Sequence, residues 1–324
     1  QPDQNKLDAF INDYIKTREN DKLVKYNILN GLVNIATYGI KNPFNYKLSD
    51  AELKKLRAEE LVTLLHNLTK YRHKVLYYGP EEKEPLVATL ATYHKTNMST
   101  RVLPAAYPFT FRKNTANEVN FANYDMVQTE ISWSRNSAMF SPVNIPVINL
   151  FNEYFGGGMA GVVFQTIRES KALAYSTYAY YGTAYKKNEP NIMKAYVGCQ
   201  ADKMNESILS MQELLDSLPF SEKLFSVTKA SLENNFATSR ILKQQILFKF
   251  LEAQRLGISY DTREKTYQLL DKFTFDDLKA FHQTMVAKKA YFINIIGDEK
   301  KVKTENLSKY GKVSKYTLKQ IFGY

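Results

Sequence analysis

An internal repeat limits the folds open to this chain more than any other feature of its sequence. Residues 58–80 and 275–298 each run from an acidic helix start through a basic loop into a hydrophobic stretch and a glycine. Leu61 corresponds to Leu278 and Gly79 to Gly297, with one extra residue in the second copy. Such long-range repetition indicates two similar structural units. We therefore expect each copy to fold as a helix followed by a strand.

The position of the repeat predicts the domain organisation. If the helix and strand close a domain, residues 1–84 are the end of a first domain, 85–108 are a connector and 109–324 are a complete second domain. The first part is expected to be helical and short of strands, because apolar residues recur there at helical spacing. They are Leu7, Phe10, Ile11, Tyr14, Ile15, Leu53, Leu56, Leu61, Leu64, Leu65 and Leu68. Ser49 and Glu52 have the spacing of a capping box.

The second domain is predicted to be α+β. It opens with a strand at 127–134 in which polar and apolar residues alternate, so one face of that strand should be buried. Helices are expected at 147–155 and 161–170, then a hairpin of two strands, 173–185 and 192–199. Residues 203–286 have a helical pattern with breaks at Pro219, Gly257 and Thr274, and a last strand starts near Tyr291. The pattern indicates an antiparallel or mixed sheet with helices packed on one face.

Composition argues against several functional classes. The single cysteine, Cys199, excludes an internal disulfide and a cysteine-rich metal cluster. No apolar run approaches the ~20 residues of a membrane-spanning helix, so no membrane insertion is expected. The net charge of +11 comes from scattered lysines rather than one basic run. A nucleic-acid binder is therefore the weakest alternative, and no nucleic-acid partner is predicted.

Catalytic motifs are also missing from the sequence. The histidines are His66, His73, His94 and His282, and none is spaced so that two imidazoles share a helical face beside a glutamate. No Gly-x-Ser-x-Gly elbow is present, and the run Gly156–Gly158 lacks the Gly-Lys-Ser/Thr ending of a phosphate loop. The sequence predicts no metal ligand, no bound cofactor and no catalytic residue of its own.

Three short motifs follow one another in the second domain. Tyr154–Met159 contains three glycines, 164–169 reads Phe-Gln-Thr-Ile-Arg-Glu, and 173–176 reads Leu-Ala-Tyr-Ser. A short turn between helix and strand can bring Arg168 and Tyr175 to one end of the sheet, where both could donate hydrogen bonds to peptide carbonyls. Arg168 could instead compensate the helix dipole, and the glycines could simply end a helix. Both interpretations stay open.

This succession resembles the second-lobe signature of the M16 metallopeptidases, also called pitrilysin-like or inverzincin peptidases. Segments 42–44 and 77–79 are similar to the end of the preceding domain in long members of that family. The resemblance implies an M16 metallopeptidase-like (LuxS/MPP-like) fold, with two similar α+β domains in each of two lobes that close around a peptide. The His-x-x-Glu-His zinc motif of the family has no counterpart here. The resemblance thus implies a C-terminal, non-catalytic lobe.

The resemblance also implies sites and partners. Arg168 and Tyr175 would be auxiliary catalytic and substrate-binding residues, and Gly156, Gly157, Gly158 and Met159 would flank the peptide path. The partners would be a peptide substrate and a catalytic M16-like lobe or subunit that carries zinc. The alternative is an inactive scaffold or peptide-binding subunit with no proteolytic role. Frequent Lys, Asn and Tyr are typical of an AT-rich bacterial genome. Because bacterial relatives are often exported, a periplasmic or secreted location is the expectation, although the sequence leaves the compartment open.

Overall fold

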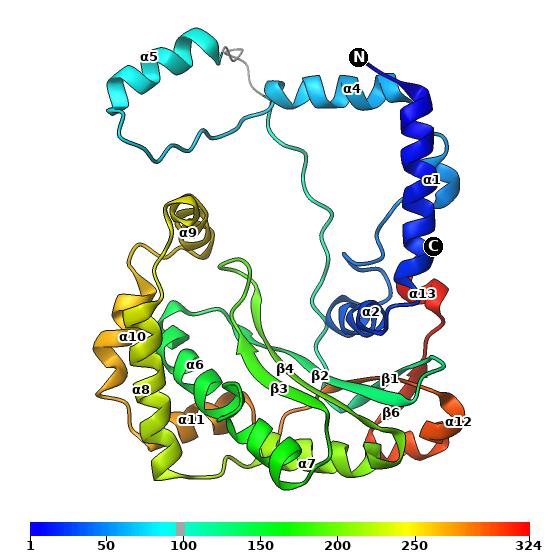
Figure 1. Cartoon of the computed structure of the whole chain (residues 1–324), viewed down its shortest axis with the longest axis vertical. Coiled ribbons are helices and arrows are strands. Elements are labelled where there is room, and N and C mark those ends of the chain that lie inside the picture. Colours follow the sequence, from blue (N-terminus) through cyan, green and yellow to red (C-terminus); the bar gives the residue numbers. More distant parts are fainter. Residues whose placement is uncertain (95–100) are drawn as a thin grey trace.

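A computed structural model describes residues 1–94 and 101–324 (Figure 1). Its centre is a six-stranded mixed sheet in the order β3-β4-β2-β5-β1-β6. Strand β4 pairs antiparallel with β2 and β3, and β2 pairs antiparallel with β5, whereas β1 runs parallel to β5 and β6. The strands are β1 Glu118–Asn123, β2 Gln128–Met139, β3 Ser176–Gly182, β4 Pro190–Gln200, β5 Phe292–Gly297 and β6 Lys312–Lys315.

Helices precede, interrupt and follow the sheet strands. Those before the sheet are α1 Gln4–Asp21, α2 Lys25–Tyr38, α3 Asp50–Leu53, α4 Ala58–Asn67, η1 Leu68–Lys70 and α5 Lys83–Tyr93. Those between β2 and β4 are η2 Pro142–Asn144, α6 Ile145–Phe151, η3 Asn152–Gly156 and η4 Phe164–Ser170. After β4 come η5 Ala201–Lys203, α7 Met204–Asp216, α8 Glu222–Thr238, α9 Lys243–Leu256, α10 Thr262–Leu270 and α11 Phe275–Met285. The last are α12 Glu299–Val302, η6 Thr304–Tyr310 and α13 Leu318–Phe322.

The main core lies between the sheet and the helices on one of its faces. Ile131 and Trp133 of β2 point into this layer and are fully buried, as are Phe151 of α6 and Met211 of α7. Burial of such side chains is the dominant favourable contribution to folding. The predicted α+β class, the 173–199 hairpin and the helical run after residue 203 are confirmed.

The opposite face of the sheet is also covered, which differs from the one-sided burial expected for β2. Helix α2 lies across β2 and β5 on that face (Figure 1). Ile28, Leu32 and Ile35 of α2 are fully or almost fully buried because the spacing i, i+4, i+7 puts them on one side of the helix. As a result Glu130 and Ser132, which alternation assigned to solvent, are buried.

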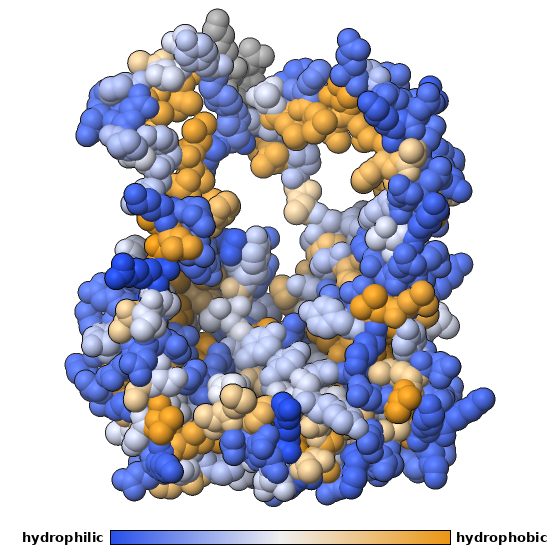
Figure 2. Space-filling model, viewed as in Figure 1, coloured by the Kyte–Doolittle hydropathy of each residue, from blue (hydrophilic) through white to orange (hydrophobic). Residues whose placement is uncertain are grey.

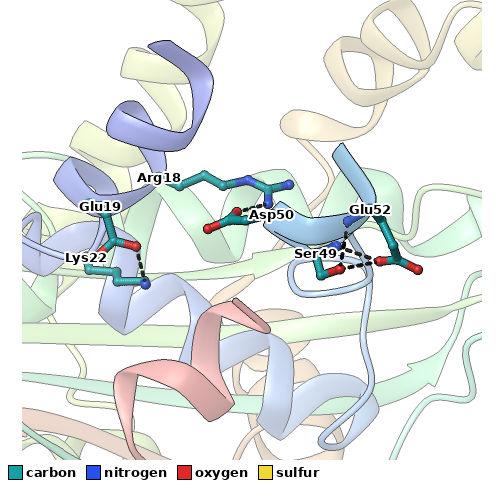
Figure 3. Close-up of polar contacts among 6 residues, drawn as sticks. All are labelled: Arg18, Glu19, Lys22, Ser49, Asp50 and Glu52. Carbon is teal, nitrogen blue, oxygen red and sulfur yellow. Dashed lines mark hydrogen bonds and ion pairs between the residues drawn. The ribbon is translucent and has the colours of Figure 1, made fainter. Parts of the chain in front are cut away.

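Polar contacts join α1 to the start of α3 (Figure 3). The buried Arg18 of α1 donates a 2.8 Å hydrogen bond to Asp50 at the start of α3, and its guanidinium lies 4.5 Å from the ring centroid of Tyr324. The Ser49–Glu52 capping box is confirmed, since each residue accepts a hydrogen bond from the other's backbone N–H. Hydrogen bonds from the Ser49 hydroxyl and the Ser49 backbone N–H to its carboxylate lower the pKa of Glu52. Residues 1–53 thus pack with the C-terminal end of the chain.

The two copies of the repeat fold differently after their helices. Helices α4 and α11 both form, and α11 leads to β5, but residues 74–79 form no strand in the described part of the chain. The expectation of a strand there was wrong for this structure. A strand needs a partner to pair its backbone groups, and among the described residues the isolated bridge near this segment joins Tyr71 to Arg101, outside residues 74–79. Leu64, Leu65 and Leu68, which recur at helical spacing in the sequence, are exposed.

The predicted connector is partly helical. Helix α5 crosses the boundary placed between residues 84 and 85, and positions 95–100 of the connector lie outside the described residues.

The sequence analysis did not predict two of the strands, β1 and β6. Strand β1 is buried on both faces, so its residues do not alternate, and β6 has only four residues. Both are placed by parallel pairing with strands distant in sequence, which local patterns do not reveal.

Candidate functional site

The glycine turn at the end of η3 is shaped by close packing. A Cβ atom at Gly156 would lie 1.7 Å from the backbone oxygen of Ala179 in β3, so only glycine fits there. Gly158 has a φ of +56°, a conformation that glycine adopts without steric cost. At both positions the geometry accounts for glycine without a ligand, and this favours the structural interpretation of the run.

Asn152, which the sequence analysis missed, fixes the turn against the edge of the sheet. Its side-chain amide donates to the Tyr181 carbonyl at 3.0 Å and its oxygen accepts from the Tyr181 N–H at 2.7 Å. These two bonds satisfy outward-facing backbone groups of the edge strand β3. The sequence signal for Asn152 was its position in the helix directly after the apolar residue Phe151. That position does not show which strand its side-chain amide would bind.

Gln165 connects the glycine loop to η4. Its side chain donates a 2.6 Å hydrogen bond to the carbonyl of Met159, whose own side chain is 75% exposed. Arg168 follows three residues later on the same helix. Met159 thus lies in the loop before η4 and is bonded to the first turn of the helix that carries Arg168. The sequence motif contained Gln165, but its role depended on the fold of the loop.

Arg168 and Tyr175 flank the turn from η4 into β3. The N–H of Leu173 bonds to the Ile167 carbonyl at 2.9 Å and closes that turn. The Arg168 side chain is 46% exposed and lies 4.9 Å above the Phe164 ring, and its one ion pair with a described residue is to Glu169 at 3.9 Å. The hydroxyl of Tyr175, which is 53% exposed, accepts a 2.6 Å hydrogen bond from Gln200. Its own proton remains available for donation.

A large groove runs beside the glycine turn along β3. Its volume is about 680 Å³, and it lies between the β3 edge with η3 on one side and α8, α9 and α10 on the other. Gly156, Ala179 and Tyr180 line its sheet side, and Leu232, Phe236 and Leu256 are among its apolar lining residues. Arg168 and Tyr175 are not among the lining residues. Of the predicted site residues, only Gly156 therefore lines this groove.

Metal-binding residues are not clustered in the described part of the chain, where no group of three or more His, Cys, Asp or Glu side chains could hold an ion. His73 and His94 meet with a 2.7 Å contact between their Nε2 atoms on the surface, as a pair only. Burial raises the pKa of the Cys199 thiol to about 11, so it stays protonated at neutral pH and is a poor nucleophile. No helix among the described residues is long and apolar enough to span a membrane.

Comparison with known proteins identifies the family. The model of the peptidase M16 inactive domain matches residues 67–232, which is half of the chain. The chain belongs to the M16 peptidase family. The predicted resemblance to the M16 peptidases is therefore confirmed, and the chain is an inactive M16 domain of a protease family.

One zinc protease resembles part of the chain in sequence, and two solved structures resemble it in fold. The chain is 33% identical to uncharacterized zinc protease YmxG of Bacillus subtilis over 86 residues. These residues make up 26% of this chain and 19% of YmxG. The M16 inactive domain from Pseudomonas fluorescens has a TM-score of 0.69 at 13% identity, over 91% of this chain and 71% of that one. The periplasmic protease PqqL from Escherichia coli has a TM-score of 0.65 at 14% identity, over 91% of this chain and 33% of PqqL.

Proposed function

We propose that this chain is the non-catalytic, peptide-binding C-terminal half of an M16-like zinc metallopeptidase. It would hold an unfolded peptide while a zinc site on another lobe or chain hydrolyses it. The observation that carries the proposal is the exposure of two hydrogen-bond donors, Arg168 and Tyr175, on the two sides of one closed turn. An inactive peptidase domain that presents such donors is suited to orient peptide carbonyls.

A groove beside the glycine turn, which Gly156 lines, also supports a binding role. The groove along β3 has a volume of about 680 Å³, within the range of ligand sites, and much of its lining is apolar. The described residues hold no cluster of metal ligands, so zinc would come from the partner lobe. The relative named as a zinc protease is consistent with a zinc-containing partner.

The domain division is part of this proposal. Residues 1–84 would be the C-terminal part of a first M16-like domain, 85–108 the connector and 109–324 the complete second domain. The exposure of Leu64, Leu65 and Leu68 supports it, because a helix with this many exposed leucines is expected to pack on more protein. A periplasmic or secreted location is proposed as well, by analogy with PqqL.

Photo-crosslinking tests whether the chain binds peptides at this turn. Tyr175 is replaced by p-benzoylphenylalanine, the protein is illuminated with a fluorescein-labelled unfolded peptide, and the labelled chain is quantified. We expect labelling that an excess of the unlabelled peptide suppresses. The same replacement at Tyr267 on α10, which is 55% exposed, is the matched control.

The result also separates this function from the scaffold alternative. Equal labelling at positions 175 and 267, or labelling that unlabelled peptide does not reduce, would show that the turn holds no peptide. Arg168→Ala in the crosslinking variant should lower the labelling, because the guanidinium is the second donor at the turn. Cleavage of the peptide by this chain alone would contradict the assignment of hydrolysis to a partner.

A further inference from the structure

A second cavity lies on the other face of the sheet, between α2 and the strands β2, β3 and β4. Its volume is about 290 Å³. Its floor is set by the strand register, which pairs Tyr180 with Lys194 and Tyr178 with Tyr196. The opening visible above the sheet in Figure 2 leaves this side of the molecule accessible. We call this cavity the tyrosine pocket, after Tyr26, Tyr178, Tyr180 and Tyr196 in its lining.

The acidic group of the tyrosine pocket is already neutralised. Glu130, with only 4% of its side chain exposed, accepts a 2.5 Å hydrogen bond from the Lys25 ammonium. Its second oxygen accepts a hydrogen bond from the Tyr196 hydroxyl. A buried carboxylate that is paired in this way has little capacity left for another cation.

The Lys194 ammonium, unlike the Glu130 carboxylate, is not paired with an opposite charge among the described residues. Lys194 lines the tyrosine pocket and is only partly exposed, yet its ammonium makes no hydrogen bond or ion pair with any described residue. Burial lowers the pKa of Lys194, which reflects the cost of holding a cation there without a counter-charge. With Lys25 and Glu130 compensating each other, Lys194 gives the pocket a net positive charge.

The neighbouring tyrosines add further donors. Tyr178 stacks on Tyr196 with ring centroids 5.0 Å apart and lies 6.1 Å from Tyr180, so the three rings form one wall. The hydroxyls of Tyr178 and Tyr180 have no hydrogen-bond partner among the described residues. Burial raises the pKa of Tyr178 to about 12, so this hydroxyl keeps its proton and can donate it.

We propose that the tyrosine pocket binds a carboxylate of the peptide, held by the Lys194 ammonium and the Tyr178 and Tyr180 hydroxyls. The carboxylate belongs either to an acidic side chain or to the peptide's C-terminus. Because Tyr180 lines both this pocket and the groove along β3, one peptide could reach both. The inference rests on the proposed peptide-binding function and adds a preference for acidic peptides.

Three fluorescein-labelled dodecapeptides of Gly, Ser and Ala test this site by fluorescence anisotropy. One carries a central Glu and an amidated C-terminus, one a central Gln and an amidated C-terminus, and one a central Gln and a free C-terminal carboxylate. We expect one or both carboxylate peptides to bind about five- to tenfold more tightly than the neutral one, as for a charge-assisted hydrogen bond. The carboxylate that gains affinity identifies the source.

Variants assign the preference to the pocket. Lys194→Met should abolish the difference between the peptides, and Tyr178→Phe with Tyr180→Phe should reduce it, while Lys223→Met on the exposed start of α8 should leave it unchanged. A carboxylate preference that survives in Lys194→Met overturns the inference. Equal binding of all three peptides by the unmodified chain overturns it too but leaves peptide binding intact, whereas no binding of any peptide contradicts the proposed function itself.

Discussion

Single atoms decide which side chains the glycine turn tolerates. The Gly156→Ala methyl would overlap the Ala179 carbonyl at 1.7 Å, whereas the space around Gly158 is open and only its φ of +56° opposes a side chain. We expect Gly156→Ala to lower the free energy of unfolding by about 3 kcal/mol or more, and Gly158→Ala by about 1 kcal/mol. Urea denaturation measures both. Equal losses would show that β3 moves away from the turn at little cost.

His282 gives the chain a specific pH dependence. It is buried in α11 near the rings of Phe151 and Phe155, and burial lowers its pKa below the ordinary 6.5. Just below pH 6.5, His282 therefore binds a proton in the unfolded chain but stays neutral in the folded chain. Stability should fall as the pH drops from 6.5 towards the lowered pKa, by at most about 1.4 kcal/mol per pH unit.

Replacement of the imidazole isolates this contribution. His282→Leu should flatten the decline in unfolding free energy between pH 7 and 5.5, as measured by urea denaturation at each pH. The exposed His66 serves as the control, and His66→Leu should keep the decline. An unchanged slope in His282→Leu would mean that other groups cause it.

At the scale of elements, α2 is the helix that joins the N-terminal segment to the sheet. Its side chain Leu32 is fully buried between helix and sheet, and Trp133, the only tryptophan, reports on the sheet itself. Leu32→Ala should lower the free energy of the transition followed by Trp133 fluorescence by about 2–5 kcal/mol. Leu64→Ala on the exposed side of α4 should change it by less than about 0.5 kcal/mol. A Trp133 transition unaffected by Leu32→Ala would mean that α2 unfolds separately from the sheet.

At the scale of the whole molecule, the chain should need a partner for chemistry. Because the described residues offer no cluster of metal ligands, we expect far less than one zinc per chain after dialysis, and no peptide hydrolysis by the purified chain. Elemental analysis and a fluorogenic peptide assay measure these. Addition of an M16-like lobe with the His-x-x-Glu-His motif should supply activity that a chelator removes. One tightly bound zinc in the chain alone would contradict this prediction.

The sequence by itself determined the family, the fold class, the hairpin and most of the helix boundaries of the second domain. These depend on local signals, such as the Gly156–Met159 run, helical spacing and the turn at residues 186–191. The Ser49 capping box was predictable for the same reason, since both partners lie within one turn. The short turn between Arg168 and Tyr175 was predictable as well, but it was not predictable that neither residue lines the groove along β3.

Tertiary structure alone decided the features that depend on contacts between distant segments. Residues 74–79 have a strand-like sequence and no strand, because pairing requires a neighbour that local pattern does not supply. Glu130 looked like a solvent-facing residue and is buried, because α2, about 100 positions earlier, packs over it. Lys194 became a candidate ligand-binding group only when the strand register placed it beside Tyr180, within a pocket whose one carboxylate was already paired with Lys25.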